Sequence, residues 1–481
     1  MTDICLIVEG SYPYVKGGVA SWIQQLIKNN PEFSFTVVAL LATEKDITDL
    51  KYKLPKNLIS LQHVFIRKET KKPILMPFKM KEMKFIKSCI DNNSIVNYEK
   101  LTKVFLKNKP IQKLMYSLDT FRLIKSLYFK HFNDMPFMNF FWSMRGFIHG
   151  FANVLCSDIP EAKLYHTVST GYAGLFSTLC KIKYPKSKLI LTEHGIYTRE
   201  RKMDITISDW SDRRFNDIDP TKSISAYRDL WEMSFNEISK LTYHYCDKIY
   251  SLNKKNNDIQ IEEGAEKSKV SFIRNGVSLS KFKYTERKSI ERLKIGFLGR
   301  VVKIKDVKTF IKSAAYIVNI YPDIEFLIAG PTEEDKDYYE SCLDLVNSLS
   351  LSKNIKFLGN VNSANFFKDI DLMVLTSLSE GQPLVIAEAN ACGVPVVATD
   401  VGGCKEMIFG DGVEDTLGQA GEITKPLEPK ETAKAILRLI EDPKLYNTYS
   451  RIAHKRANLF YNEETFKSKY NLIYKGYVWQ A

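Results

Sequence analysis

Two glutamates eight residues apart, Glu380 and Glu388, are the side chains of this 481-residue chain best suited to chemistry by type and spacing. They lie in TSLSEGQPLVIAEANACG, residues 376–393. The apolar run Leu372–Leu375 predicts a buried strand, and a helix is predicted over Pro383–Cys392, where a first-position proline is tolerated. Because a helix start favours phosphate, the two carboxylates could accept hydrogen bonds from sugar hydroxyls beside a diphosphate. A buried α/β crossover with two solvated glutamates is the open alternative.

Cations follow another predicted strand, Leu293–Leu298. Arg300 comes directly after its final Leu-Gly, and Lys303 and Lys305 follow in the same loop. The planar fork of an arginine and the point charge of a lysine suit the two negative charges of a diphosphate. Solvated cations at a strand end are the alternative, which weakens once the helix start at Pro383 is placed on the same sheet edge.

Loops of the first half offer further candidates. Gly17 and Gly18 open a predicted helix after the strand Ile4–Val8, where glycines let the backbone approach a phosphate or sugar. They do not form the GxGxxG fingerprint, so a nicotinamide cofactor is not expected. His194 follows the predicted strand Lys188–Thr192 and could bond a sugar hydroxyl or stabilise developing charge. A plain tight turn and a structural histidine remain open readings.

Three more residues are weaker acceptor-site candidates, namely Tyr14, Arg199 and Arg201. The two arginines could serve a diphosphate or an acceptor, or simply pair with the glutamate between them. Two D-x-D stretches, Asp217–Asp219 and Asp369–Asp371, match a metal–nucleotide pattern. The first lies in a charged, irregular stretch and the second leads straight into an apolar strand, so no metal site is expected.

The elements that must position these residues alternate between short apolar runs and amphipathic helical stretches, which predicts an α/β fold with two doubly wound domains and a cleft between them. In such sheets, ligands bind at the carboxyl ends of the strands. We expect domains at 1–280 and 290–460, joined by a polar linker over 277–289, with a final helix at 461–481 returning to the first domain. A basic, mostly helical insertion is expected at about 68–153.

Composition limits the classes of protein. A chain with 44% apolar and 26% charged residues is typical of a globular enzyme. No apolar run reaches the roughly 18–20 residues that span a bilayer, and the eight cysteines show no metal-ligand spacing, so a cytoplasmic protein is expected. The net charge of +13 concentrates in the first third. With no zinc-finger, RRM or helix-turn-helix signature, nucleic acid is disfavoured, leaving a membrane or protein partner or a solvated lysine-rich exterior.

Four stretches, in order along the chain, carry a family resemblance: EGSYPYVKGGVASW, TEHGIYTRER, GRVVKIKDVKTFI and SEGQPLVIAEA. With them the chain resembles retaining glycosyltransferases of the GT-B type in the family 4 clan, and more narrowly PelF-like enzymes of Pel exopolysaccharide biosynthesis. The resemblance implies two Rossmann-like domains facing a central cleft, the first for the acceptor and the second for a nucleotide-sugar donor. It also implies a UDP-sugar (UDP-glucose or a UDP-N-acetylhexosamine) as co-substrate, no other cofactor and no metal, a growing exopolysaccharide as acceptor, and membrane-bound synthase subunits as partners.

The resemblance also assigns residues. It gives catalytic roles to His194, Glu380, Arg300 and Lys305. It gives donor-binding roles to Gly17, Gly18, Arg300, Lys305, Asn360, Val361, Glu380, Gly381, Gln382, Pro383, Leu384 and Glu388, the last at the ribose. Two alternatives stay open: a nucleotide-sugar 2-epimerase of the same fold, and a non-catalytic scaffold subunit of a membrane polysaccharide synthase. A cytoplasmic location with peripheral recruitment to the inner face of the cell membrane is expected.

Overall fold

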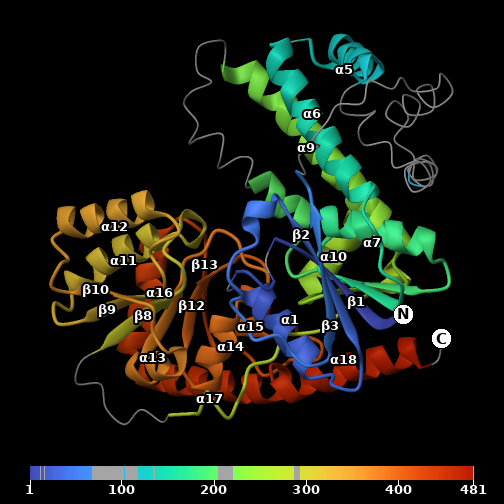
Figure 1. Ribbon diagram of the computed structural model, residues 1–481. Helices are drawn as coiled ribbons and strands as arrows, with labels where there is room; N and C mark the ends of the chain where they lie inside the picture. The colour runs from blue at the N-terminus through green and yellow to red at the C-terminus, as the bar shows by residue number, and fades with distance from the viewer. Residues whose placement is uncertain are drawn as a thin grey trace. The chain divides into compact units, whose positions relative to one another are not determined.

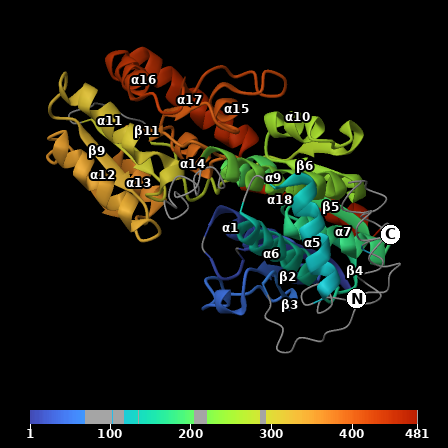
Figure 2. The same cartoon turned by 90° about the horizontal axis from the view of Figure 1, so that it is seen from above.

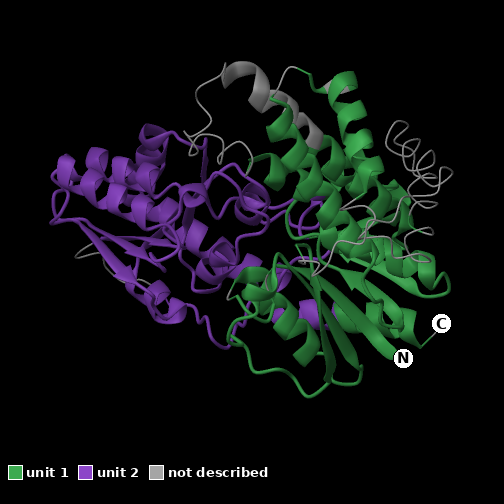
Figure 3. Ribbon diagram, turned by 45° about the horizontal axis from the view of Figure 1, so that its top comes forward, with its two compact units in different colours: residues 1–251, 257–271, 470–481 green, residues 252–256, 272–469 purple. Residues whose placement is uncertain are grey.

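The computed structural model describes residues 1–10, 12–15, 17–67, 102, 117–133, 136–203, 220–285 and 293–479, with the backbone alone at 131 and 220–230. The chain divides into two compact units, coloured separately in Figure 3. Unit 1 holds residues 1–251, 257–271 and 470–481, and unit 2 holds 252–256 and 272–469. The chain thus changes unit at 271–272, before the expected linker at 277–289, and again at 469–470, later than the expected 461.

Unit 1 is built on a seven-stranded sheet with the order β3-β2-β1-β4-β5-β6-β7. Its strands are β1 Thr2–Glu9, β2 Phe35–Leu41, β3 Leu58–Phe65, β4 Ala162–Thr167, β5 Lys188–Thr192, β6 Lys248–Ser251 and β7 Val270–Phe272. The pairs from β3 to β6 are parallel. Residues 4–8 of β1 are fully buried, as expected for a central strand covered on both faces.

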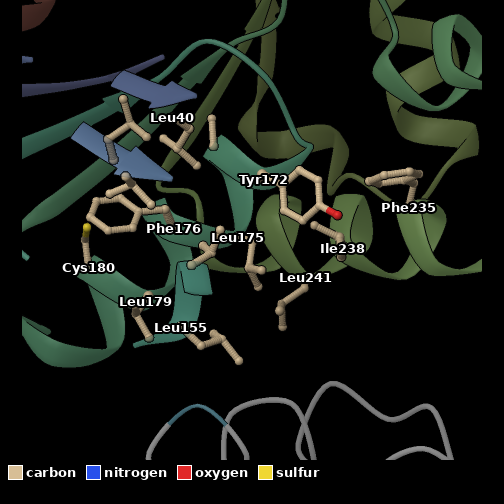
Figure 4. Close-up of a cluster of buried hydrophobic side chains, with 14 of the residues drawn as sticks. Leu40, Leu155, Tyr172, Leu175, Phe176, Leu179, Cys180, Phe235, Ile238 and Leu241 are labelled. Atoms are coloured by element: carbon tan, nitrogen blue, oxygen red, sulfur yellow. The ribbon is translucent and has the colours of Figure 1, made fainter. Parts of the chain in front are cut away.

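Helices cover this sheet (Figure 1). The helices of unit 1 are α1 Gly18–Lys28, α5 Leu118–His131, α6 Phe137–Leu155, α7 Tyr172–Lys183 and α9 Pro220–Tyr245, of which α5 lies away from the sheet at the far end of α6. Two more helices, α10 Lys254–Glu262 and α18 Glu463–Val478, hold residues of both units. Figure 4 shows the core beneath them, where Leu175, Phe176 and Leu179 of α7 lie among side chains of neighbouring elements. Full burial of each such side chain contributes about 1.5–3 kcal/mol, which anchors α7 to the sheet edge where the candidate residues of unit 1 lie.

The helices α5, α6 and α9 extend from the sheet of unit 1 as an arm (Figures 1 and 2). Phe147 of α6 meets Trp231 of α9 edge to face, and Phe132 stacks on Phe140 where α5 joins α6. Of these helices, α5 and most of α6 lie within the expected insertion at about 68–153, of which residues 68–101, 103–116 and 134–135 lie outside the described part. Among the described helices, none is both long and apolar enough to cross a membrane.

Unit 2 has a six-stranded, fully parallel sheet with the order β10-β9-β8-β11-β12-β13. Its strands are β8 Lys294–Leu298, β9 Glu325–Ala329, β10 Ile355–Gly359, β11 Leu372–Leu375, β12 Val396–Thr399 and β13 Gly421–Thr424. Its helices are α11 Val307–Val318, α12 Lys336–Ser348, α13 Ser363–Asp369, α14 Leu384–Ala391, α15 Cys404–Phe409, α16 Pro429–Glu441 and α17 Pro443–Phe460. Unit 2 also contains the 3-10 turn η4 Lys303–Lys305, and unit 1 contains the 3-10 turns η1 Glu44–Asp46 and η3 Lys267–Lys269.

Two strands, β3 and β13, were not expected from the sequence. Both are edge strands, and β3 is only partly buried along most of its length, so neither shows the continuous apolar pattern of a central strand. The helix predicted over Pro383–Cys392 is α14, in which Pro383 is the N-cap in an extended conformation rather than the first helical residue.

The C-terminal helix contributes directly to unit 1. Tyr474 is hydrogen-bonded to Nδ1 of the buried His166 at 2.8 Å, and the other ring nitrogen of His166 is hydrogen-bonded to Thr192 at 2.8 Å. Tyr470 is hydrogen-bonded to the same threonine at 3.0 Å. Burial lowers the pKa of His166 to about 3, so the ring is neutral and can donate from one nitrogen while it accepts at the other.

Candidate functional site

The strand order of unit 2 changes direction between β8 and β11, the position where doubly wound sheets open a crevice for ligands. Lys305 follows β8 and Glu380 follows β11, and the structure brings them together: the Lys305 ammonium donates to Oε1 of Glu380 at 2.5 Å. Their side chains are only 19% and 10% exposed. The Ser377 hydroxyl donates to the same carboxylate oxygen at 2.6 Å. A half-buried ion pair therefore marks the switch point.

Backbone contacts hold the two loops together. The Thr376 hydroxyl donates to the carbonyl of Asp306 at 2.8 Å, and the N–H of Leu378 donates to the carbonyl of Ile304 at 2.8 Å. Asp306 adopts the left-handed conformation, with φ of 45°, and its carboxylate caps α11. Such a conformation persists in a residue other than glycine when its surroundings fix it, here through the capped helix. The lysine and glutamate are thus carried by a rigid support.

A third loop, after β12, presses on the turn that carries Glu380. A Cβ atom at Gly402 would lie 1.7 Å from the carbonyl oxygen of Glu380, and Gly402 has φ of +52°. The N–H of Gly403 donates to the carbonyl of Gly381 at 2.9 Å, and the Asn253 side chain donates to the same carbonyl at 3.2 Å. Sequence reasoning missed both glycines, although a Gly-Gly pair after an apolar strand was a usable signal.

The two residues that precede α14, Gln382 and Pro383, have different roles. The side chain of Gln382 is used internally: its oxygen accepts from the N–H of Asn275 at 2.6 Å, and its amide donates to the carbonyl of Leu252 at 3.0 Å. Pro383 provides no side-chain cap, and α14 has none within the described chain. The first N–H groups of α14, beginning at Leu384, are therefore open to an anion.

Glu388 lies one helical turn inside α14 and is half-buried. Burial raises the pKa of its carboxyl group to about 7, and the charge of Lys281 opposes this only partly. Among the described residues, none donates a hydrogen bond to this carboxylate. A desolvated carboxylate without a donor is suited to accept hydrogen bonds from a hydroxyl-bearing ligand.

The other predicted residues of unit 2 lie apart from the lysine–glutamate pair. Arg300 is 49% exposed, and its guanidinium pairs with Glu334 rather than with Glu380. Asn360 and Val361 are exposed on the loop after β10, at the edge of the sheet. The structure therefore brings together Lys305 and Glu380 but leaves Arg300 turned toward another partner.

In unit 1, His194 follows β5 with its ring 4.6 Å from that of Trp22, edge to face. Its Nε2 atom is buried and has no hydrogen-bond partner in the described chain. Burial lowers the pKa of His194 to about 4. The imidazole is thus neutral at pH 7.

Two glutamates missed by sequence reasoning, the buried Glu193 and the half-buried Glu9, organise the loops around His194. Glu193 accepts from the N–H of Tyr197, and Glu9 accepts from the Tyr197 hydroxyl at 2.9 Å and from the N–H of Ala173 at 3.3 Å. Further donors to Glu193 are Thr170, Tyr243 and Gln260. A Cβ atom at Gly171 would lie 2.1 Å from the Tyr197 ring, so the tyrosine fits only against glycine. The signal was present in the sequence, since both glutamates end apolar strands.

The weaker candidates of unit 1 already have partners. Arg201 pairs with Glu9 at 3.5 Å and lies over the ring of Tyr197, while Arg199 lies 3.6 Å from Glu262 and 3.7 Å from Glu263. Both arginines are therefore engaged by carboxylates of unit 1.

Tyr14 is buried, with its hydroxyl 2.6 Å from Nε2 of His63. Gly17 and Gly18, in contrast, are exposed, and a Cβ at either would meet no atom within 4 Å.

Of the two D-x-D stretches, the one at 369–371 lies in the described part of the chain. Asp371 accepts from the N–H of Lys294 at 2.7 Å and so ties β11 to β8, whereas Asp217–Asp219 lies outside the described residues. Across the described part of the chain, no three His, Cys, Asp or Glu side chains form a potential metal-ligand group.

Solved structures of other proteins share the fold of this chain. The described fold matches sucrose-phosphate synthase from Thermosynechococcus elongatus with a TM-score of 0.63 at 15% identity, covering 100% of both chains. It matches HepE from Anabaena in complex with UDP with a TM-score of 0.62 at 16% identity, covering 99% of this chain and 100% of that one. The predicted GT-B fold, with two parallel α/β sheets, is confirmed.

Two family models match the sequence, one to each half of the chain. Residues 281–456 match the family described as "Glycosyl transferases group 1", which makes this region a glycosyltransferase domain of the GT-B type. Residues 2–268, more than half of the chain, match "Domain of unknown function (DUF3492)", and the chain belongs to that family.

Curated relatives match a more limited region. D-inositol 3-phosphate glycosyltransferase of Kineococcus radiotolerans is 26% identical over 215 residues, 41% of this chain and 49% of the relative. The Mycobacterium tuberculosis protein of the same name is 28% identical over 214 residues, 42% of this chain and 43% of the relative. The chain spans about half the length of the curated relatives it matches.

Proposed function

We propose that the protein is a retaining glycosyltransferase that transfers a hexosyl unit from a UDP-sugar, either UDP-glucose or a UDP-N-acetylhexosamine, to an acceptor hydroxyl. The observation that carries the proposal is the half-buried pair of Lys305 and Glu380 at the switch point of unit 2, near the uncapped start of α14. A sequestered cation and open helix N–H groups suit a diphosphate. The group 1 domain and the UDP bound to HepE support this donor class.

In the proposed complex, Lys305 binds the donor diphosphate together with the first N–H groups of α14. Glu380, released from that lysine, accepts hydrogen bonds from hexose hydroxyls, and Glu388 accepts them from the ribose. Arg300 is exposed, so it can leave Glu334 for the diphosphate at little cost, because an exposed ion pair contributes only about 0–1 kcal/mol. The roles given to His194, Gly17, Gly18, Asn360 and Val361 stay predictions, as do those of Tyr14, Arg199 and Arg201.

The proposed reaction needs no protein nucleophile. The bond from the anomeric carbon to the diphosphate oxygen breaks, the acceptor oxygen bonds to that carbon on the same face, and the acceptor proton passes to the leaving diphosphate. Lys305 and the helix start stabilise the charge that develops on the leaving group, and one such preorganised donor is worth on the order of 3–4 kcal/mol. Neither a metal nor any other cofactor belongs to the proposed reaction.

The resemblance to PelF-like sequences supports a further part of the proposal. The acceptor is a growing exopolysaccharide, the partners are membrane-bound polysaccharide synthase subunits, and the protein acts in the cytoplasm with peripheral recruitment to the inner face of the membrane. The acceptor and these partners depend on the four sequence stretches alone.

A donor screen tests the proposal. The full chain is mixed with UDP-, GDP- and ADP-sugars, and thermal shift and nucleotide release are read together, with Glu380→Gln and Glu388→Gln as matched variants. We expect a UDP-sugar to raise Tm and to release UDP slowly, and both variants to weaken the shift. An epimer formed from UDP-N-acetylglucosamine without acceptor would indicate the 2-epimerase instead. No response to any nucleotide sugar would favour the non-catalytic scaffold.

A further inference from the structure

The end of the arm of unit 1 carries large apolar side chains on its exterior. We define the arm tip as residues 117–133 and 136–146, which comprise α5 and the first half of α6. Four of its apolar side chains are between 57 and 62% exposed: Leu118, Phe129, Met138 and Trp142. Phe121 is exposed as well. Soluble proteins seldom gather so many large apolar groups on one exposed element unless the surface binds something.

Helical spacing shows that on α5 these groups form a stripe with cations. Leu118, Arg122, Lys125 and Phe129 recur at intervals of four, three and four residues, so they share one exposed face. The opposite face packs into the core through Leu123, Ile124 and Leu127. The exposed apolar groups are therefore additional to those that fold the arm, and the core of unit 1 does not need them.

On α6, Met138, Trp142 and Arg145 share a face in the same way, while Phe140 and Met144 are buried in the core. Figures 1 and 2 show α5 and α6 together at the end of the arm. Each of the two helices thus presents exposed apolar groups beside cations.

The charge of the arm tip is positive. Its cations include Arg122, Lys125, Lys130 and Arg145, and its described acid Asp119 is paired with Arg122 at 3.6 Å. Two cations lie over the exposed rings, Lys125 at 6.0 Å from Phe129 and Arg145 at 5.5 Å from Trp142. Across residues 68–153 the sequence has 16 Lys and Arg against six Asp and Glu, an excess of ten within a chain of net charge +13.

We propose that the arm tip docks on an anionic lipid bilayer, with Phe129, Met138 and Trp142 in the headgroup region and the neighbouring cations on lipid phosphates. Aromatic and aliphatic groups bordered by Lys and Arg are the composition of helices that lie in a membrane interface, and cations there are attracted by anionic lipid. The inference rests on the proposed function only through its peripheral recruitment to a membrane. It does not depend on the sugar chemistry of unit 2.

Vesicle co-sedimentation of the full chain tests this inference. Two sets of vesicles are compared, one of pure phosphatidylcholine and one with about 40% of the anionic lipid phosphatidylglycerol, so that they differ in surface charge. The variant Phe129→Ser/Trp142→Ser removes two exposed rings. The matched control is Trp479→Ser, because Trp479 is also about 60% exposed with a cation, Lys475, over its ring. A second variant, Lys125→Glu/Arg145→Glu, reverses two charges.

We expect the wild-type chain to bind anionic vesicles only. The double-serine variant should bind them at least about tenfold more weakly, because each ring buries apolar area in the interface. Charge reversal should weaken binding about fivefold or more for each position, and the control should bind as wild type does. Vesicle binding of the double-serine variant equal to wild type would overturn the inference, as would equal binding to both lipid compositions or to neither. UDP-sugar thermal shifts without vesicles report on the donor site, so failure of one proposal is distinguishable from failure of the other.

Discussion

Glu388→Gln gives the sharpest test of the candidate donor site, because its effect on stability depends on pH. The carboxyl group has a pKa of about 7 in the folded chain, above the ordinary 4.5. Between these two values the folded chain holds a proton that the unfolded chain has released, so stability falls as the pH rises through this window. Glutamine cannot ionise and resembles the protonated form in size. The variant should therefore match wild type near pH 5 and exceed it at pH 8.

The magnitude follows from the interval between the two values. At about 1.4 kcal/mol per pH unit, an interval from 4.5 to about 7 corresponds to at most about 3.5 kcal/mol. Urea unfolding of the full chain from pH 5 to 8 measures it, read on the transition that Glu388→Gln shifts. Glu340→Gln, at an exposed position of α12, is the control. Parallel pH profiles for wild type and Glu388→Gln would refute the assignment of a desolvated carboxyl group to this position.

The same carboxyl group should report ligand binding. If ribose hydroxyls donate to Glu388, they favour its ionised form, and UDP binding near pH 7 releases part of a proton. Calorimetry in two buffers of different ionisation enthalpy measures that release, and Glu388→Gln should abolish it. UDP binding with the same proton release in wild type and variant would show that the ribose does not contact this residue.

Further predictions concern the loops. Lys305→Ala should lower kcat about 100- to 1,000-fold, while Lys303→Ala, which removes an exposed cation of the same 3-10 turn, should retain activity; near-wild-type turnover of the first variant contradicts its role. Gly402→Ala should cost about 1–3 kcal/mol from its positive φ alone and displace the turn that carries Glu380, so calorimetry should show lower Tm and loss of UDP binding. Tyr197→Phe removes one buried hydrogen bond and should lower stability by about 1 kcal/mol, which an unchanged urea midpoint would disprove. Transfer activity should survive EDTA, and a loss that Mn²⁺ restores would contradict the proposed metal-independent reaction.

The sequence predicts the central part of the fold better than its edges. Strands such as Lys188–Thr192 and Leu372–Leu375 are found with the predicted bounds, because a parallel strand buried on both faces needs a continuous apolar run. The edge strands β3 and β13 lack that run and were missed. The change of unit at 271–272 depends on contacts between segments far apart in the chain, which no local pattern encodes.

The candidate site divides in the same way. That Lys305 and Glu380 lie on neighbouring strand ends follows from spacing and from the rules of parallel sheets. The partners of Arg300 and Arg201 could not be read from spacing, because Glu334 and Glu9 reach them through tertiary structure. The Gly-Gly pair at 402–403 marks a close approach of the backbone, but that Gly402 leaves space for the carbonyl oxygen of Glu380 follows from the three-dimensional packing.

The tyrosines that bond to His166 and Thr192 have a consequence for synthesis of the protein. Unit 1 includes residues 470–481, so Tyr470 and Tyr474 cannot cover His166 and Thr192 while the ribosome is still translating those codons. The residues of unit 2, up to Lys469, emerge earlier, so this unit can fold before unit 1 is complete. Until Tyr474 is synthesised, the surface around Phe33 that it contacts stays uncovered. Expression of residues 1–271 alone would therefore yield an unfinished unit that requires chaperones, whereas supplying residues 463–479 in trans should complete it.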